Sequence, residues 1–306
     1  MPQGGRVSHK SRIILNASGG RLGAQEKVAA VEQAMRAAGL DYPLMVTEYP
    51  GHATQLARQA VADGCTTVIA GGGDGTINEV VNGLFQAAGA GAPELPTALG
   101  ILPLGSANDL AAALNLPGDL TEACRVLARG QSRRIDVGCV NGHYFVNNSA
   151  VGLEPVVTIA QHQMRWIKGT ARYVAAALKT IIAAKEWHMR VEWDTGMYDG
   201  PLVLVSVGNG IRTGGAFYFT PRSKLDDGKF DFVYALAMSR LNMFALLPKT
   251  FTGKHIGHSK VGYFKSRSVR VTASPATPIQ ADGEVIETAA TEILFEIVPQ
   301  KLQVIA

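Results

Sequence analysis

The sequence predicts a protein of two domains, one α/β and one β, because its hydrophobic pattern changes near residue 136. Over residues 11–136, short apolar runs alternate with segments of helical spacing, which is typical of a parallel sheet covered by helices on both faces. Over residues 137–306, short strand-like runs are separated by Asn-Gly and Asp-Gly pairs. We therefore expect an N-terminal doubly wound parallel-sheet domain over 11–136 and a C-terminal antiparallel β-sandwich domain over 137–306. The last strands are free to return to the first domain.

The first half alternates regularly between predicted strands and predicted helices. The helical segments repeat apolar residues three or four positions apart, and two of them end at Gly39 and Gly64. The predicted strands are 12–16, 43–48, 67–70 and 100–104, and the predicted helices are 25–38, 51–63, 76–88, 106–114 and 120–129.

The second half is predicted to be mostly short strands. Turns are expected at Asn141-Gly142, Asp199-Gly200, Asp227-Gly228 and Asp282-Gly283. The predicted strands are 143–147, 191–193, 202–208, 230–237, 269–273, 292–298 and 302–305.

One long helix is expected at 161–184 within the β half. At about 100° per residue, its basic residues fall in one wedge and its apolar residues gather opposite. The basic residues of this wedge are Arg165, Lys168, Arg172 and Lys179. Packing of an amphipathic surface helix explains the pattern, and a face for an anionic membrane is the alternative.

The composition indicates a globular protein with an ample core. Apolar residues make up 47% of the 306 residues and charged residues 18%, with a net charge of +4. This mild excess permits an anionic partner without requiring one. The basic residues are dispersed without a module for nucleic acid, so nucleic-acid binding is not expected. No run reaches the ~18 apolar residues of a membrane span, and no signal peptide is recognisable. We therefore expect a cytoplasmic protein.

The glycine-rich segment from Gly71 to Glu79 follows a predicted strand and leads into a predicted helix. Glycines let the backbone approach a phosphate, and the first N–H groups of a helix point towards it. Asp74 lies inside this turn, and a carboxylate beside a phosphate calls for a divalent cation. The alternative is that Thr76 and Glu79 form only a helix capping box. No Gly-Lys-Ser/Thr follows, so the turn is not a Walker A loop.

Two further turns follow predicted strands, at 16–20 and 103–109. In a parallel sheet these turns share the edge at which ligands bind. Ser106 and Asp109 fit either a helix cap or a phosphate contact. Glu284 follows a predicted hairpin turn, which could direct its carboxylate to act as a base towards a hydroxyl. The seven histidines have no metal or triad spacing.

Six segments in this order resemble the diacylglycerol kinase catalytic-domain family, which includes sphingosine and ceramide kinases and soluble bacterial lipid kinases. The order and spacing of the segments make the resemblance specific, because NAD kinases and phosphofructokinases share the glycine loop alone. It extends from Arg12 to the end of the chain. The segments are 71–83, 102–109, 134–138, 147–152, 224–231 and 282–284.

The resemblance implies an ATP-dependent lipid kinase that transfers the γ-phosphoryl group to the hydroxyl of a lipid such as diacylglycerol or a sphingoid lipid. The first domain would be NAD kinase/phosphofructokinase-like, and the second would form the lipid-substrate side of the cleft. Asp74 would act through a catalytic Mg²⁺ supported by Asp109, and Glu284 would accept the hydroxyl proton. The residues implied to contact ATP are Asn16, Ala17, Ser18, Gly19, Thr47, Gly72, Gly73, Asp74, Gly75, Thr76, Ile77, Asn78, Glu79 and Ser106.

The same resemblance implies a second, structural Mg²⁺ held by the side chain of Asp227 and the carbonyls of Lys224 and Lys229. The chain departs from the family pattern at Ala17, where proline is usual, and at Glu154-Pro155. Neither departure removes a proposed catalytic group.

The resemblance also implies a lipid substrate met at a membrane surface, with peripheral contact on the inner membrane face through the basic wedge. A homodimer is compatible with the sequence, which does not determine the oligomeric state. An NAD kinase-like enzyme is the nearest alternative, and a non-catalytic nucleotide- or lipid-binding regulator is another. Retention of Asp74, Asp109 and Glu284 argues against the regulator.

Overall fold

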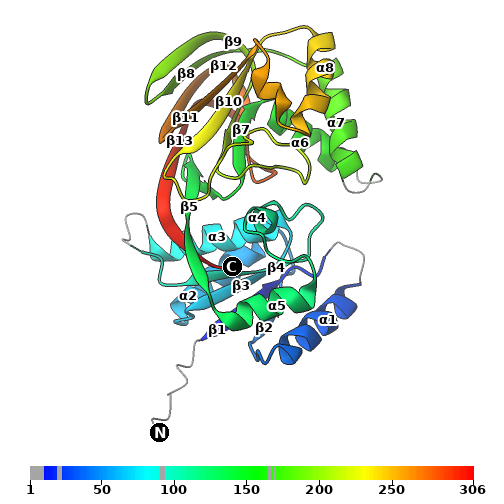
Figure 1. Ribbon diagram of the computed structural model, residues 1–306, viewed down its shortest axis with the longest axis vertical. Coiled ribbons are helices and arrows are strands. Elements are labelled where there is room, and N and C mark those ends of the chain that lie inside the picture. The colour runs from blue at the N-terminus through cyan, green and yellow to red at the C-terminus, as the bar shows by residue number, and fades with distance from the viewer. Residues whose placement is uncertain (1–9, 19–22, 90–93, 165–166, 168–169) are drawn as a thin grey trace. The chain divides into compact units, whose positions relative to one another are not determined.

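The computed structural model describes residues 10–18, 23–89, 94–164, 167 and 170–306. The chain divides into two units (Figure 1). Unit 1 comprises the residues up to Leu104, Leu116–Arg133 and Leu302–Ala306, and unit 2 comprises Gly105–Asn115 and Arg134–Lys301. The main division lies close to the expected boundary at 136 and 137, with residues 134–136 in unit 2. Residues 105–115 also belong to unit 2, which was not expected, and the chain end belongs to unit 1, a return that the sequence left open.

Unit 1 contains a parallel sheet with the strand order β13-β4-β3-β1-β2. The last strand, β13, returns to this sheet, where Val304 pairs with Leu99. Because β1 lies between β2 and β3, the strand order reverses there, and ligands of such sheets bind beyond the carboxyl ends at this point. The strands are β1 (Ser11–Leu15), β2 (Leu44–Val46), β3 (Thr67–Gly72), β4 (Ala98–Pro103) and β13 (Glu284–Ile305).

Helices cover both faces of this sheet, as the alternating pattern predicts. On one face, Leu15 packs in a buried cluster with Val31 and Leu127, which come from two different helices. On the other face two helices touch at Gly83, where a Cβ would lie 2.5 Å from the carbonyl oxygen of Thr54. The helices are α1 (Ala24–Ala37), α2 (His52–Ala62), α3 (Asp74–Ala88) and α5 (Leu120–Arg129).

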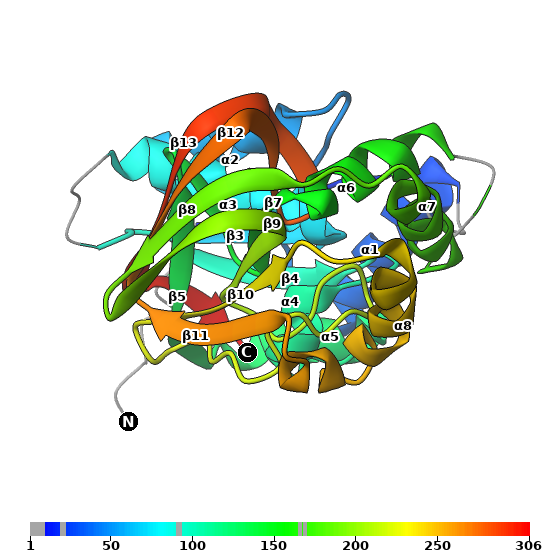
Figure 2. The same ribbon diagram turned by 90° about the horizontal axis from the view of Figure 1, so that it is seen from above.

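Unit 2 is built around antiparallel strands. The long strands β9 and β12 each pair with β7 at one end and with β8 at the other, so that these strands close on themselves around a core (Figure 2). That core includes Val151, Met189, Val205 and Ile279. The strands are β5 (Ser132–Val140), β6 (His143–Phe145), β7 (Asn148–Gly152), β8 (Trp187–Trp193), β9 (Gly196–Gly208), β10 (Phe230–Leu236), β11 (Val261–Ser266) and β12 (Ser268–Ala281).

The predicted turn at Asp199-Gly200 is wrong. Both residues lie inside β9, where they pair with Arg190 and Met189 of β8. The chain turns instead between β8 and β9, at 194–195. The N–H of Asp194 donates to Ser266 Oγ at 3.0 Å, and its carboxylate accepts from the N–H of Arg267 at 2.9 Å. These contacts with the neighbouring strands determine where the hairpin bends.

The single long helix predicted at 161–184 is also wrong. The structure has α6 (Leu153–Gln163) and α7 (Thr170–Ile182), separated by a segment in which Met164 has φ −104° and ψ 47°, outside the helical region. The apolar repeat continues from one helix to the other, so the two resemble one helix in sequence. Arg165 and Lys168 of the predicted basic wedge lie outside the described residues.

Two more helices belong to unit 2. The five-residue α4 (Asp109–Ala113) is shorter than its predicted span of 106–114. The helix α8 (Arg240–Thr250) was not among the predicted elements, and its N-terminus is capped by Ser239 Oγ. In Figures 1 and 2, α6, α7 and α8 lie together at one side of the strands. Among the described residues, no helix is long and apolar enough to cross a membrane.

Candidate active site

The glycine loop of unit 1 connects β3 to α3, as the sequence predicts. Gly73 precedes the first turn of α3 and, having no side chain, leaves the helix N-terminus without a side-chain cap. A Cβ on Gly72 would lie 2.4 Å from Thr76 Oγ1, and a Cβ on Gly71 would lie 2.9 Å from Leu15 Cδ1. Only glycine fits at Gly72 without displacing Thr76. The uncapped N–H groups of the first turn of α3 are suited to bind an anion.

The turn after β1 is joined to this loop by hydrogen bonds. Asn16 N–H donates to Gly71 O at 2.8 Å, and Asn16 Nδ2 donates to Thr76 Oγ1 at 3.2 Å. Asn16 Oδ1 in turn accepts from Ser18 N–H at 3.0 Å and from Ser18 Oγ at 2.6 Å. Lys27 Nζ donates to Asn16 O at 3.3 Å, a cation near the loop that the sequence analysis missed. Three predicted ATP contacts are thus brought together at the carboxyl ends of β1 and β3.

Glu79 holds α2 against α3. Its carboxylate accepts from the N–H of Gly51 at 2.9 Å and from the N–H of Ala53 at 3.0 Å, which caps the start of α2. Thr54 Oγ1 donates to the carbonyl of Glu79 at 2.9 Å. The capping-box alternative is therefore wrong, because Glu79 caps a different helix from its own. Through this contact its side chain fixes the helix that carries the glycine loop.

The remaining predicted residues of unit 1 have plainer surroundings. Thr47 N–H donates to Leu15 O at 2.9 Å, which extends the pairing of β1 with the chain beyond β2. Ile77 and Asn78 are buried in α3. Ala17, in the turn after β1, is also buried. Gly19 lies outside the described residues.

In unit 2, Asp109 is a buried carboxylate with a partly buried partner, Arg212. Its Oδ1 accepts from Arg212 Nε at 2.7 Å, and the N–H of Gly215 donates to both carboxylate oxygens at 3.1 and 3.2 Å. Arg212 also donates to Ala107 O at 3.0 Å. The alternative that Ser106 and Asp109 form a helix cap is wrong, because α4 begins at Asp109 and its carboxylate holds the 212–215 segment. Arg212 was not predicted as a site residue. Its place in a glycine-containing segment, between Gly210 and Gly214, was the signal in the sequence that could have drawn attention to it.

Glu284 is an exposed carboxylate on a rigidly held turn. Asp282 and Gly283 have φ of 48° and 85°, the positive angles of the tight hairpin turn that the sequence predicts. The buried carboxylate of Asp282 accepts from three backbone N–H groups, those of residues 146–148, at 2.8 to 3.1 Å. Gly283 N–H donates to Gln280 Oε1 at 2.8 Å. The fixed turn limits where the carboxylate of Glu284 can lie.

A buried polar network continues from this turn to Glu154. Gln280 Nε2 donates to Glu154 Oε1 at 3.1 Å, and Asn148 Nδ2 donates to the same oxygen at 2.7 Å. Burial raises the pKa of Glu154 to about 7, although hydrogen bonds from Asn148 and Gln280 oppose the shift. In sequence, Glu154 is only a departure from a family pattern, whereas the structure makes it the centre of this network.

An apolar cavity of about 100 Å³ lies in unit 2 beside Glu154. Its walls come from α6, α7, α8 and neighbouring strands, with Val157, Phe217, Met243 and Leu247 among them. Glu154 is the only carboxylate among the described lining residues. Its volume is of the order of the engineered apolar cavity, about 150 Å³, that admits benzene.

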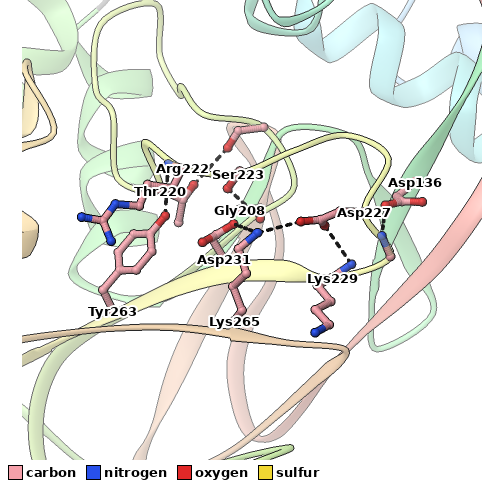
Figure 3. A network of polar contacts seen from close by, with 12 residues as sticks. Asp136, Gly208, Thr220, Arg222, Ser223, Asp227, Lys229, Asp231, Tyr263 and Lys265 are labelled. Atoms are coloured by element: carbon pink, nitrogen blue, oxygen red, sulfur yellow. Dashed lines mark hydrogen bonds and ion pairs between the residues drawn. The ribbon is translucent and has the colours of Figure 1, made fainter.

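The predicted structural Mg²⁺ site lies in the turn before β10 (Figure 3). Lys265 Nζ lies 2.6 Å from Asp227 Oδ2 and 3.3 Å from Oδ2 of Asp231, a buried carboxylate whose pKa is raised by burial. Asp227 Oδ1 accepts from Lys229 N–H at 3.2 Å. The described residues contain no group of three or more His, Cys, Asp or Glu side chains suited to a metal ion. Lys265 therefore lies where a cation beside Asp227 would be, and the structural Mg²⁺ stays a prediction.

Asp136 holds the same turn from the other side. Its two oxygens accept from the N–H of Gly228 and the N–H of Gln300, both at 2.7 Å. These bonds connect the turn to β5 and β13. Burial raises the pKa of Asp136. The predicted ligands Lys224, Asp227 and Lys229 thus lie in one well-anchored segment.

Two family models together match nearly the whole chain. Residues 10–140 match the diacylglycerol kinase catalytic domain, and residues 148–306 match the YegS C-terminal NAD kinase beta sandwich-like domain.

Solved structures with the same fold include a diacylglycerol kinase from Bacillus anthracis. It has a TM-score of 0.78 and 24% identity, and the match covers 97% of this chain and 96% of that one. An NAD kinase from Archaeoglobus fulgidus in complex with ATP is more distant. Its TM-score is 0.54 at 13% identity, over 97% of this chain and 93% of that one.

Curated relatives extend the match at the level of sequence. Diacylglycerol kinase from Bacillus subtilis is 31% identical over 277 residues, which cover 90% of this chain and 89% of the relative. Diacylglycerol kinase from Staphylococcus carnosus is 29% identical over 90% of this chain and 88% of the relative. These matches show that the chain belongs to the diacylglycerol kinase family. The glycine loop of unit 1 and the Glu284 carboxylate on its fixed turn in unit 2 agree with this membership.

Proposed function

We propose that this protein is an ATP-dependent lipid kinase that phosphorylates the hydroxyl of a lipid such as diacylglycerol or a sphingoid lipid. The observation that carries the proposal is found in unit 2, where one hydrogen-bonded network connects an apolar cavity to the turn of Glu284. A lipid acceptor requires both an apolar site for its chain and a base for its hydroxyl. Membership in the diacylglycerol kinase family supports the same conclusion.

Unit 1 supplies the nucleotide side of the reaction. The N–H groups at the start of α3, together with Asn16 and Ser18, are suited to hold the phosphates of ATP. Asp74, in the first turn of α3, is a donor that fits Mg²⁺, because Mg²⁺ takes one or two carboxylates together with phosphate oxygens. When bound there, Mg²⁺ would neutralise charge on the phosphates. Lys27 adds a positive charge close to the same turn.

Unit 2 supplies the acceptor side. The lipid oxygen attacks the γ-phosphorus, a new P–O bond forms, and the bond from the γ-phosphorus to the β–γ bridging oxygen breaks, releasing ADP. The hydroxyl proton passes to the carboxylate of Glu284. Because Glu284 is exposed, it returns that proton to solvent. Asp109 supports the site indirectly, by holding Arg212 and the 212–215 segment.

The second Mg²⁺ has no step in this mechanism, because Lys265 balances the charge of Asp227.

We also propose peripheral contact with the inner membrane face of the cell. Leu178 and Ile182 of α7 and Leu241 of α8 are exposed large apolar side chains, and Lys179 lies beside them. α7 and α8 pack together, so both helices can meet one surface. Arg172 contributes less to such a face, because its Nε donates to Ile167 O at 2.7 Å.

The test is transfer of phosphate from labelled ATP with Mg²⁺ to lipids in mixed micelles. Glu284→Gln is expected to lower turnover on the order of 10²- to 10⁴-fold, with little change in ATP affinity. Glu287→Gln, an exposed residue on the same strand, is the matched control and should stay active. Undiminished turnover by Glu284→Gln would remove Glu284 from the mechanism.

The choice of acceptors separates the alternatives. Diacylglycerol, monoacylglycerol, ceramide, sphingosine and NAD are offered in parallel. Phosphorylation of NAD alone would indicate an NAD kinase-like enzyme. ATP binding without any labelled product would indicate a non-catalytic regulator.

A further inference from the structure

Glu154 occupies a fixed place in the wall of the apolar cavity. It is the second residue of α6, a helix that begins directly after the tightly packed Gly152. Gly152 has φ of 85°, and a Cβ there would lie 2.4 Å from the carbonyl oxygen of Val203. The start of α6 is therefore pressed against β9, which determines where the Glu154 side chain begins. That side chain is almost entirely buried, at 3% exposure.

The two carboxyl oxygens of Glu154 have different surroundings. Oε1 accepts from Asn148 and Gln280, and each of these amides is held by a further bond. Asn148 Oδ1 accepts from Thr213 Oγ1 at 2.8 Å, and Gln280 Oε1 accepts from Gly283 N–H at 2.8 Å. Oε2 is buried and, in the part of the chain that the structure describes, has no hydrogen-bond partner. Buried polar atoms are rarely left unsatisfied, and the Glu154 residue lines the cavity, so a ligand that enters the cavity and reaches this oxygen would complete it.

The chemistry of the cavity wall indicates the kind of ligand atom. Burial raises the pKa of Glu154 to about 7, so below neutral pH most molecules carry a proton on this carboxyl group. The other titratable groups among the described lining residues are Tyr173 and Tyr234, whose pKa values burial raises, and His255, whose pKa burial lowers. All three are therefore neutral near pH 7. With Oε1 taken by two donors, the proton belongs on Oε2, which then needs an acceptor atom.

The network also indicates where along the lipid this acceptor atom would lie. Glu154 is joined through Gln280 to Gly283, the residue directly before Glu284. A lipid whose hydroxyl is at Glu284 and whose chain enters the cavity must therefore pass Glu154 close to its reacting end. In an acylglycerol or a ceramide, the acceptor atom in that part of the molecule is the carbonyl oxygen of the acyl linkage.

We propose that Glu154 determines acceptor specificity by donating a hydrogen bond from Oε2 to the carbonyl oxygen of an acyl linkage in the lipid. The proposal rests on the proposed function and narrows it. Acyl lipids, with ester or amide carbonyls, are the preferred acceptors. Ether lipids and free sphingoid bases, which lack that carbonyl, are poorer acceptors.

The test compares diacylglycerol with the dialkylglycerol of the same chain length. Both have the hydroxyl and the chains, and only the first has carbonyl oxygens. The wild type is expected to prefer the diacyl lipid about three- to tenfold in kcat/KM, mainly through KM, which is the value of one hydrogen bond. Glu154→Leu should lose this preference, and Glu154→Gln, which keeps an N–H donor at the same place, should retain it. Ceramide and sphingosine, compared in the same way, test the amide carbonyl.

A matched control separates the hydrogen bond from the shape of the cavity. Ile181→Val trims another lining residue of the same cavity and should affect the diacyl and dialkyl lipids equally. ATP affinity and thermal unfolding, measured for each variant, report whether the fold survives.

Three results would overturn the proposal while leaving the kinase activity in place. In the first, the wild type has equal kcat/KM for diacylglycerol and dialkylglycerol. In the second, Glu154→Leu keeps the wild-type preference for the diacyl lipid, and in the third, the wild type prefers sphingosine to ceramide and loses that preference when the Glu154 carboxylate is removed. Failure of the proposed function itself looks different, because then the wild type phosphorylates none of these lipids.

Discussion

Glu154 is expected to make unit 2 less stable as the pH rises towards neutrality. In the unfolded chain this carboxyl group titrates at its ordinary pKa of 4.5, whereas burial raises the pKa to about 7 in the folded protein. Between these values the folded state holds a proton that the unfolded state has lost. Since the folded state then binds more protons, the free energy of unfolding falls as the pH rises.

The size of this effect follows from the two pKa values. The rise in pKa from 4.5 to about 7 corresponds to about 3 kcal/mol over the full titration. Most of this, about 2 to 3 kcal/mol, is lost between pH 5 and pH 8. Glu154→Gln has no titrating group at this position and retains an oxygen for Asn148 and Gln280. The variant should lack this component of the pH dependence.

The assay is urea unfolding of both proteins at pH 5, 6, 7 and 8, followed by tryptophan fluorescence. Trp187 and Trp193 lie in β8 of unit 2, so their signal reports the unit that contains Glu154. The stability of the wild type relative to Glu154→Gln should fall by about 2 to 3 kcal/mol across this range, and other titrating groups cancel in the comparison. A difference that is constant with pH would refute the assignment of a raised pKa.

Two more substitutions test the buried charges of unit 2. Arg212→Ala leaves Asp109 buried without its cation and is expected to cost ~3 kcal/mol in urea unfolding, whereas the exposed Arg222→Ala should change little. A cost below ~1 kcal/mol would mean that the ion pair does not hold the 212–215 segment. Lys265→Met removes the cation between Asp227 and Asp231, so added Mg²⁺ should raise the Tm of this variant but not that of the nucleotide-free wild type. Stabilisation of the wild type by Mg²⁺ without nucleotide would instead support the structural Mg²⁺ site.

Local sequence preferences account for the parts of the fold that were predicted correctly. The glycine loop was placed between a strand and a helix, as found between β3 and α3, because glycine and helix-start signals act over a few residues. The hairpin turn at Asp282-Gly283 formed for the same reason, since both residues favour positive φ. The same preference failed at Asp199-Gly200, where pairing with β8 overrides it.

The alternation of strands and helices, the glycine loop and the motif order are local or repeated features, so the sequence by itself determined the fold class and the kinase family. The tertiary structure alone decided which distant groups meet. Asp109 pairs with Arg212 across 103 residues, and Gln280 reaches Glu154 across 126. Spacing carries no signal over such distances. The raised pKa of Glu154 likewise depends on burial, which exists only once α6, β7 and β12 pack together.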